Sequence, residues 1–204
     1  MGVLEICQVT KWYRRERAVL ERLDLIVEKG ETLCVTGRGG SGASTLFQIL
    51  SGQVRPDEGS VVWKGKAAFV FDALPRMRGV TVAQYGEAVG FVQKVDRKER
   101  RNAFLEALTY FGMEKRRGQT VSSLNAYEAC LVMFALARMQ KPDIVVMDQW
   151  QKYVSDFQES RLWGIVKQWV KEEGAALVCF SDTEVLEDFF DKKLELRRGQ
   201  LKGR

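Results

Sequence analysis

The stretch GRGGSGAST, residues 37–45, says more about the fold than any other part of the sequence. It differs at one position from a phosphate-binding loop, whose pattern is Gly, four residues, Gly, Lys and then Ser or Thr. Gly37, Gly42 and Ser44 fit this pattern, but Ala43 stands where the lysine is expected. That lysine normally brings positive charge to the outer phosphates of a nucleotide. The stretch is therefore either a nucleotide site without one working group or a glycine-rich turn.

The flanking segments give the loop the context that a phosphate site needs. ETLCVTG, residues 31–37, is a short apolar run that ends in glycine, as a buried strand does. ASTLFQIL, residues 43–50, carries apolar residues at helical spacing. The loop is thus predicted between a strand and a helix, and the N-terminus of that helix favours an anion through its N–H groups and its dipole.

The order of the other segments predicts an α/β fold. Near the N-terminus, VLEICQVT and LDLIVEKGE alternate like strands. IVVMD at 144–148 and AALVCF at 175–180 read as buried strands, and an amphipathic helix is predicted at 160–174 between them. Buried strands that are separated by helices imply a largely parallel sheet covered on both faces.

Two segments are predicted as hairpins. GSVVWKGKAAFVFD, residues 59–72, has turn-forming residues at its middle. KLELRRGQLKG, residues 193–203, places Arg198 and Gly199 at its turn.

Length and composition fit one compact domain over residues 1–204. Hydrophobic residues make up 46% of the chain and charged residues 29%, which is ordinary for a globular protein. A mostly helical block from about 76 to 140 reads as an insertion into that domain. The 4 cysteines are scattered and histidine is absent, which argues against a zinc site.

The net charge of +5 is concentrated in short basic clusters, at 14–17, 96–101, 114–117 and the C-terminus. Such clusters indicate solvated faces, or attraction to an anionic membrane surface or an acidic partner. No nucleic-acid-binding motif accompanies them, so no nucleic-acid partner is expected.

From the first strand to the last hairpin, this order resembles the ATP-binding subunit of ABC transporters. VLERLDLIVEKGETLCVTG, residues 19–37, is similar to the family's approach to its phosphate loop, and IVVMD is similar to its second nucleotide motif. The resemblance implies a P-loop NTPase fold of the ABC ATPase type. Such a domain has an antiparallel β subdomain, a mostly parallel core sheet and an inserted helical subdomain.

The resemblance also implies roles for residues by position. Tyr13 stands where the family places an aromatic ring against adenine. Ser44 and Asp148 stand where a hydroxyl and an acid hold Mg²⁺, and Asp72 replaces a glutamine that contacts metal and water. The nucleotide-binding positions implied are Tyr13, Gly37, Arg38, Gly39, Gly40, Ser41, Gly42, Ala43, Ser44 and Thr45.

Three positions that carry the family's chemistry hold other residues. Ala43 replaces the lysine, Gln149 replaces the glutamate that positions water, and Ser181 replaces the histidine at the γ-phosphate. Ala43 has neither charge nor donor, Gln149 cannot take a proton from water at neutral pH, and Ser181 cannot carry charge. ATP hydrolysis needs neutralised phosphates and an oriented water. We therefore expect little turnover and assign no catalytic residue, although Arg38 is a candidate for a substitute cation.

The segment SSLNAYE is similar to the family's signature motif LSGGQ, aligned through Leu124. Asn125, Ala126 and Tyr127 replace its Ser-Gly-Gly, and Glu128 replaces its glutamine. In the family, two subunits enclose two nucleotides, and the signature of one chain faces the phosphate loop of the other. The two glycines permit a close backbone approach, which the ring of Tyr127 opposes.

These observations favour a degenerate ABC-type nucleotide-binding subunit that binds ATP and Mg²⁺ weakly or not at all. It would act as a non-hydrolysing scaffold or regulator of an integral membrane subunit, in the cytoplasm at the inner face of the cell membrane. The family's architecture implies a homodimer or a heterodimer with another ABC subunit. Two alternatives stay open: an active ATPase that uses non-standard residues, and a binding module whose loop holds another anion or nothing.

Overall fold

The structure, a computed structural model, describes residues 2–14, 17–71, 73–75, 77–149, 155–181 and 189–203. The chain divides into two compact units. The first comprises Met1–Phe69, Asp143–Gln149 and Val170–Arg204, and the second comprises Val70–Pro142 and Trp150–Trp169.

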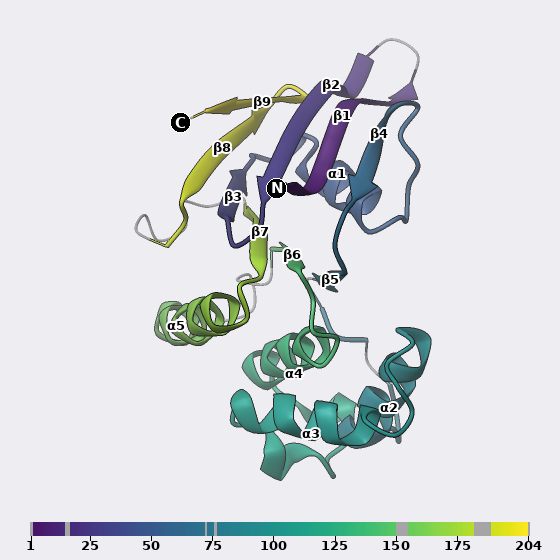
Figure 1. Ribbon diagram of the computed structural model, residues 1–204, viewed down its shortest axis with the longest axis vertical. Helices are drawn as coiled ribbons and strands as arrows, with labels where there is room; N and C mark the ends of the chain where they lie inside the picture. The colour runs from purple at the N-terminus through teal and green to yellow at the C-terminus, as the bar shows by residue number, and fades with distance from the viewer. Residues whose placement is uncertain are drawn as a thin grey trace. The chain divides into compact units, whose positions relative to one another are not determined.

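The β-structure forms two sheets (Figure 1). The smaller sheet has the order β2-β1-β4, from strands β2 (Arg17–Glu28), β1 (Gly2–Arg14) and β4 (Glu58–Trp63). Its neighbouring strands are antiparallel.

The larger sheet has the order β5-β6-β7-β3-β8-β9. Its strands are β5 (Ala67–Val70), β6 (Ile144–Asp148), β7 (Ala176–Ser181), β3 (Thr32–Thr36), β8 (Lys192–Arg197) and β9 (Gln200–Gly203). The four strands from β6 to β8 are parallel, and β9 is antiparallel to β8. The predicted antiparallel β subdomain and mostly parallel core sheet are confirmed.

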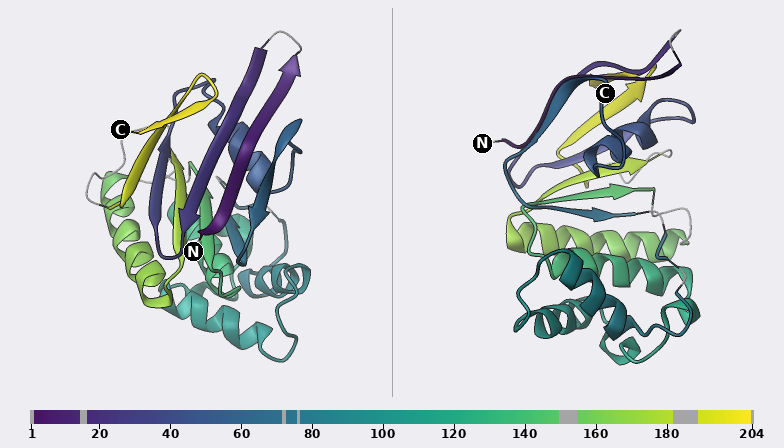
Figure 2. Two further views of the ribbon diagram at one scale, coloured as in Figure 1. Left: turned by 45° about the horizontal axis from the view of Figure 1, so that its top comes forward. Right: turned by 90° about the vertical axis from the view of Figure 1, so that its right-hand side faces the viewer.

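Helix α1 (Ala43–Leu50) lies between the two sheets (Figure 2). Six of its eight residues are buried, so apolar side chains face both sheets. The ring of Phe47 meets the rings of Phe69 and Phe180 edge-on, at centroid distances of 6.1 and 6.0 Å. Burying a side chain such as Phe47 contributes about 1.5–3 kcal/mol, so α1 is firmly held.

The hairpin predicted over residues 59–72 is wrong. Strand β4 pairs with β1 in the smaller sheet, whereas β5 is next to β6 in the larger sheet. The chain crosses between the sheets at Gly65, where an added Cβ would lie 2.7 Å from the Cβ of Asp143. The glycine therefore permits a close backbone approach and does not form the tip of a turn.

The hairpin predicted over residues 193–203 is confirmed as β8 and β9. Arg198 and Gly199 have φ values of 52° and 79°. Two positive φ values are typical of the type I′ turn, whose twist matches that of the flanking strands.

The second unit contains α2 (Val82–Val92), α3 (Arg100–Tyr110), α4 (Ala126–Arg138) and most of α5 (Asp156–Glu173). Short 3₁₀ helices, η1 (Glu114–Arg116) and η2 (Val121–Ser123), lie between α3 and α4. Phe111 packs against the rings of Phe134 and Trp169, each at 5.9 Å. The predicted helices are thus present, while the reading of 1–204 as one domain stays a prediction.

The packing of α2 on α3 gives a test of this unit. A Cβ at Gly86 in α2 would overlap the ring of Phe104 in α3, whereas a Cβ at Gly164 in α5 would meet nothing within 4 Å. We expect Gly86→Ala to lower the free energy of unfolding by about 1–3 kcal/mol through overpacking. Gly164→Ala is expected to raise it by about 0.5–1 kcal/mol through helix propensity. Urea unfolding followed by circular dichroism measures both, and shifts in the same direction would contradict the packing.

Candidate functional site

The carboxyl ends of three parallel strands bring several predicted site residues together. Asp148 at the end of β6 pairs in register with Phe180 of β7. The N–H of Gln149 donates to the carbonyl oxygen of Phe180 at 3.1 Å, and the N–H of Gly37 donates to that of Ser181 at 3.0 Å. Ligands of parallel α/β sheets bind at this edge, so the loop, Asp148, Gln149 and Ser181 share one candidate site.

Glycine at position 42 is required by the shape of the loop. Gly42 precedes α1 with a φ of 104°, in the region that glycine adopts without strain. An added Cβ would lie 2.8 Å from both the carbonyl oxygen of Val19 and a methyl carbon of Leu20 on β2. The loop therefore rests directly on β2, and its curvature depends on this glycine.

The loop presents a set of N–H groups that no carbonyl accepts. The N–H of Ser41 donates to Arg38 at 2.9 Å, and that of Ala43 makes a long contact of 3.4 Å to the hydroxyl of Ser41. Among the described residues, no acceptor is found for the N–H groups of Gly39, Gly40, Gly42, Ser44 and Thr45. Unpaired donors at the start of a helix form an anion site, so the backbone fits a phosphate without the lysine.

The residues present also fit a magnesium ion that accompanies a phosphate. Ser44 exposes its side chain in the first turn of α1, whereas Thr45 is buried. Asp148 is half-buried at the end of β6. In the described part of the chain, no three acidic or cysteine side chains form a metal site of their own. An ion here would take its other ligands from phosphate and water, as Mg²⁺ commonly does. Asp72 lies outside the described residues.

Tyr13 lies near the end of β1 with 56% of its surface exposed, as stacking on a flat base requires. The ammonium group of Lys11 lies 5.7 Å from the centre of its ring. Lys11 is held by an ion pair with Asp57 at 3.0 Å. The N–H of Trp12 donates to Asp57, and this bond, followed by Lys11, lowers the pKa of that carboxyl group.

Strand pairing connects Tyr13 with the loop. Trp12 pairs with Ala18 across the β1–β2 hairpin, so Tyr13 lies beside the start of β2. The next residues of β2, Val19 and Leu20, are those that contact Gly42.

Ala43, Gln149 and Ser181, three residues that differ from those expected by the family resemblance, have uncharged side chains. Ala43 is buried at 5% exposure in the core around α1. Ser181 is buried at 2% exposure. Gln149 is half-buried with a φ of 40°, a conformation that costs a non-glycine residue about 1–2 kcal/mol. The site therefore keeps its backbone geometry while these three side chains carry neither a cation nor a general base.

The signature-like segment forms the start of α4 in the second unit. Asn125 accepts the N–H of Glu128 at 2.9 Å, and Glu128 accepts the N–H of Asn125 at 3.1 Å. This is a capping box, which satisfies two donors at the helix start. Glu128 also pairs with Arg116 at 2.8 Å. Both polar side chains thus have partners: Asn125 at the start of α4, and Glu128 both there and on η1.

Three further residues of the signature-like segment lie next to this capping box. Leu124 is extended and half-buried just before the cap. Ala126 and Tyr127 are the first two residues of α4, and Tyr127 is half-buried. The helix start that a signature motif requires is present, but a tyrosine side chain stands where the motif has glycine.

The sequence of residues 20–152 matches the profile of a protein family described as ABC transporter. This match covers more than half of the chain. The chain belongs to the ABC transporter family. It is a nucleotide-binding subunit of that type.

Curated relatives and solved structures agree with this assignment. The chain is 25% identical to the ABC transporter ATP-binding protein YtrE of Bacillus subtilis, over 95% of this chain and 91% of YtrE. It is 26% identical to the lipoprotein-releasing system ATP-binding protein LolD of Hyphomonas neptunium, over 98% and 96%.

Two solved structures show the same fold. The dimeric ATP-binding cassette MJ0796 bound to ADP and Pi has a TM-score of 0.85 at 22% identity, covering 98% of this chain and 96% of that one. The structure of cbiO1 from Clostridium perfringens has a TM-score of 0.85 at 18% identity, covering 98% and 87%.

A hollow of about 310 Å³ adjoins the loop of this ABC subunit, and the motifs did not predict it. The loop contributes Arg38, Gly39, Gly40 and Ser41 to its lining. The end of β8 and the turn after it contribute residues 195–198. These segments are far apart in sequence, and only the position of β8 beside β3 brings them together. The hairpin turn was visible in the sequence, but its position at the loop was not.

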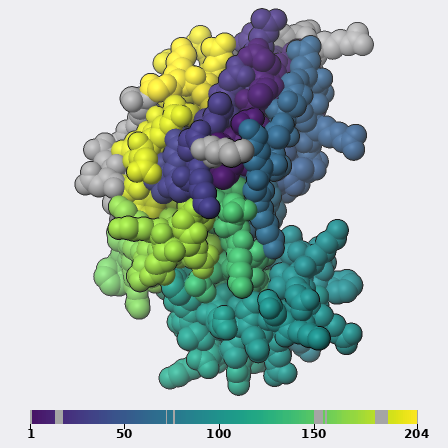
Figure 3. Space-filling model, viewed as in Figure 1, coloured from purple at the N-terminus to yellow at the C-terminus, as the bar shows by residue number. Residues whose placement is uncertain are grey.

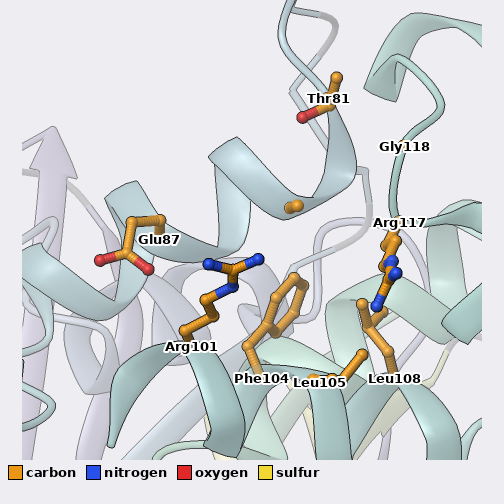
Figure 4. Close-up of a pocket in the computed structure, with 9 residues that line it drawn as sticks. Thr81, Glu87, Arg101, Phe104, Leu105, Leu108, Arg117 and Gly118 are labelled. Atoms are coloured by element: carbon orange, nitrogen blue, oxygen red, sulfur yellow. The ribbon is translucent and has the colours of Figure 1, made fainter. Parts of the chain in front are cut away.

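A second hollow, of about 250 Å³, lies in the helical unit between α2 and α3 (Figure 4). Phe104, Leu105 and Leu108 of α3 give it an apolar floor. Arg101 and Arg117 stand on either side of the Phe104 ring. This hollow is an apolar groove with a charged rim, and we call it the α2–α3 groove.

The capping box gives a test of the signature-like segment. Asn125→Ala removes the acceptor for the N–H of Glu128 and is expected to lower the free energy of unfolding by about 1 kcal/mol. Asn125→Ser keeps a capping oxygen and should lie within a few tenths of a kcal/mol of wild type. Denaturant unfolding monitored by circular dichroism distinguishes them, and equal stability of the two variants would show that Asn125 is not the cap.

Proposed function

We propose that this ABC subunit binds Mg-nucleotide weakly and hydrolyses it negligibly. It acts instead as a scaffold or regulator of a membrane partner. One observation carries the proposal: the N–H groups of Gly39, Gly40, Gly42, Ser44 and Thr45 lack an acceptor among the described residues, while Ala43, Gln149 and Ser181 supply no charge. The backbone supports binding, whereas turnover needs side chains that this chain lacks.

The energetic cost of losing catalytic groups favours a loss of turnover over a modest decrease in its rate. Removing one preorganised donor from an active site typically costs about 3 kcal/mol, or roughly a hundredfold in rate. Three positions are changed in one site, and such effects need not add. Gln149 can still hold a water through a hydrogen bond, but it cannot accept the proton of that water.

The signature-like segment supports the same proposal, because in a dimer it would face the phosphate loop of the other chain. MJ0796 is described as dimeric with ADP and Pi bound. In a dimer of the family's kind, Tyr127 of one chain would approach the phosphate loop of the other. A homodimer would carry this obstacle in both sites. A heterodimer would carry it in the site whose phosphate loop belongs to the other subunit.

We infer that the partner is an integral membrane subunit, and that the chain lies in the cytoplasm at the inner face of the cell membrane. The names of two relatives support this, since LolD belongs to a lipoprotein-releasing system and cbiO1 is part of an ABC transporter complex. Within the described residues, no helix is long and apolar enough to cross a membrane. In this role, residues 1–204 act as one domain with an inserted helical part.

The α2–α3 groove is the proposed seat for the membrane partner. Its floor is apolar and its rim carries Glu87, Arg101 and Arg117. A short amphipathic helix binds such a groove through apolar anchors, and the charges at the rim fix its orientation. The helical unit thus has a binding surface that does not require nucleotide turnover.

Binding and turnover can be measured separately on the purified chain. We expect phosphate release from Mg-ATP by wild type to be no faster than release by Asp148→Ala. Ala43→Lys should tighten Mg-ATP binding about tenfold, because it adds a charged donor, without restoring turnover. Ala43→Met adds a side chain of similar length without charge and should leave the affinity unchanged. Wild-type turnover that Asp148→Ala removes would show an active ATPase with non-standard residues.

The groove has its own test in membranes of the source cells. Leu105→Asp places a charge on the groove floor and should cost about 2 kcal/mol of binding, roughly thirtyfold in affinity. Phe157→Asp makes the same kind of change at a 78% exposed position on α5, outside the groove. Co-sedimentation with membranes should fall for the first variant and persist for the second. Equal retention of both would place the partner elsewhere.

A further inference from the structure

The hollow beside the loop carries an excess of positive charge. Arg38, Arg197 and Arg198 line it and have exposed side chains. Among the residues that the structure describes, none of these guanidinium groups has an ion-pair or hydrogen-bond partner. The lining also contains Glu195, a half-buried residue whose backbone lies opposite that of Lys202 on β9, so three arginines face one carboxylate in this hollow. Guanidinium groups match the geometry of phosphate oxygens, so unpaired arginines around a hollow favour a phosphate ligand.

The turn that carries Arg198 is fastened to the loop by backbone bonds. The N–H of Gly199 donates to the carbonyl oxygen of Ser41 at 3.3 Å, and the N–H of Glu21 on β2 donates to the carbonyl oxygen of Gly199 at 3.0 Å. A Cβ on Gly199 would lie 2.7 Å from the carbonyl oxygen of Val19. Figure 3 shows the β8–β9 hairpin on the surface beside β2. Arg198 is therefore held at a fixed place next to the loop.

Arg198 has a backbone conformation that its residue type disfavours. Its φ of 52° belongs to the first central position of a type I′ turn, where Asn, Asp and Gly are favoured. Arginine is disfavoured at such a position relative to glycine, because its Cβ crowds the following carbonyl oxygen. Strained residues of this kind concentrate at ligand sites.

We propose that Arg38, Arg197 and Arg198 form a phosphate-binding site in this hollow, which brings to the loop the positive charge that Ala43 lacks. Its ligand is a multiply charged phosphate, either the outer phosphates of a Mg-nucleotide on the loop or free pyrophosphate. If the ligand is a nucleotide, the inference rests on the proposed function, because it requires that the loop binds nucleotide. If the ligand is pyrophosphate, the inference is independent of the proposed function.

The test measures the binding of Mg-ATP and of pyrophosphate by titration calorimetry at low salt. Arg198→Gly is expected to weaken binding about tenfold, and Arg38→Ala combined with Arg198→Gly about a hundredfold. Glycine suits the turn at position 198, so this variant should fold at least as well as wild type, which its thermal midpoint checks. Lys202→Ala removes the same charge from the same hairpin outside the hollow and should change the affinity less than twofold. Arg198→Lys keeps the positive charge and should retain most of the binding affinity.

Tyr13→Ala distinguishes the two sources of phosphate. If it weakens the binding of Mg-ATP but not that of pyrophosphate, the site holds the phosphates of a nucleotide whose base lies on Tyr13. If it affects neither ligand and both bind equally, the site takes free phosphates.

Two results would overturn the inference: affinities in the arginine variants equal to wild type, or no binding of either ligand to wild type at millimolar concentration. The first result would leave the proposed function standing. The second would also contradict the weak nucleotide binding that the proposed function includes, whereas phosphate release measures the proposed loss of turnover independently of both.

Discussion

The packing of α1 between the two sheets governs everything else in the candidate site. Leu46 and Phe47 are buried at 0% and 3% exposure, and close-packed side chains leave the helix little freedom to shift. Gly42 joins this helix to the loop in a conformation that brings the backbone against Val19 and Leu20 of β2. The direction of the N–H groups is therefore set by apolar packing and by one glycine. The described core side chains around α1 are apolar, so the set of inward-facing loop N–H groups persists with alanine at position 43.

The start of α4 shows the same separation between local structure and chemistry. Asn125 and Glu128 bond to each other's N–H groups, so the helix begins where a signature motif would begin. This capping needs only an oxygen at the first position and a carboxylate or amide three residues later. It places no demand on the residues between them, where alanine and tyrosine stand. A stable helix start is thus maintained without the glycines that a close approach to phosphate needs.

The sequence predicted features that depend on short-range patterns and missed those that depend on strand pairing. The loop, α1, β6 and the β8–β9 hairpin follow from apolar spacing, glycines and turn residues within a few positions of one another. The hairpin predicted over 59–72 failed because alternation identifies a strand but not its partner. Gly65 looked like a turn residue, yet it allows the chain to pass Asp143 on the way to another sheet. For the same reason the position of Arg198 beside the loop was not predictable, since it follows from the place of β8 next to β3.

The strand order also makes positive charge near the loop compatible with the proposed loss of turnover. Strand β3, which leads into the loop, has β7 and β6 on one side and β8 on the other. Gln149 follows the end of β6, and Ser181 ends β7. The family resemblance predicts that these two positions correspond to those of water activation and γ-phosphate contact. Arg197 ends the strand on the opposite side, and Arg198 follows it in the turn. Charge supplied from the β8 side can hold a phosphate by Coulomb attraction, which needs little precision in geometry. It cannot orient a water on the β6 side or take its proton, because those tasks need a group within hydrogen-bonding distance of the reacting atoms. The proposed function thus separates holding a nucleotide from splitting it, and under that proposal nucleotide occupancy alone is the signal to a membrane partner.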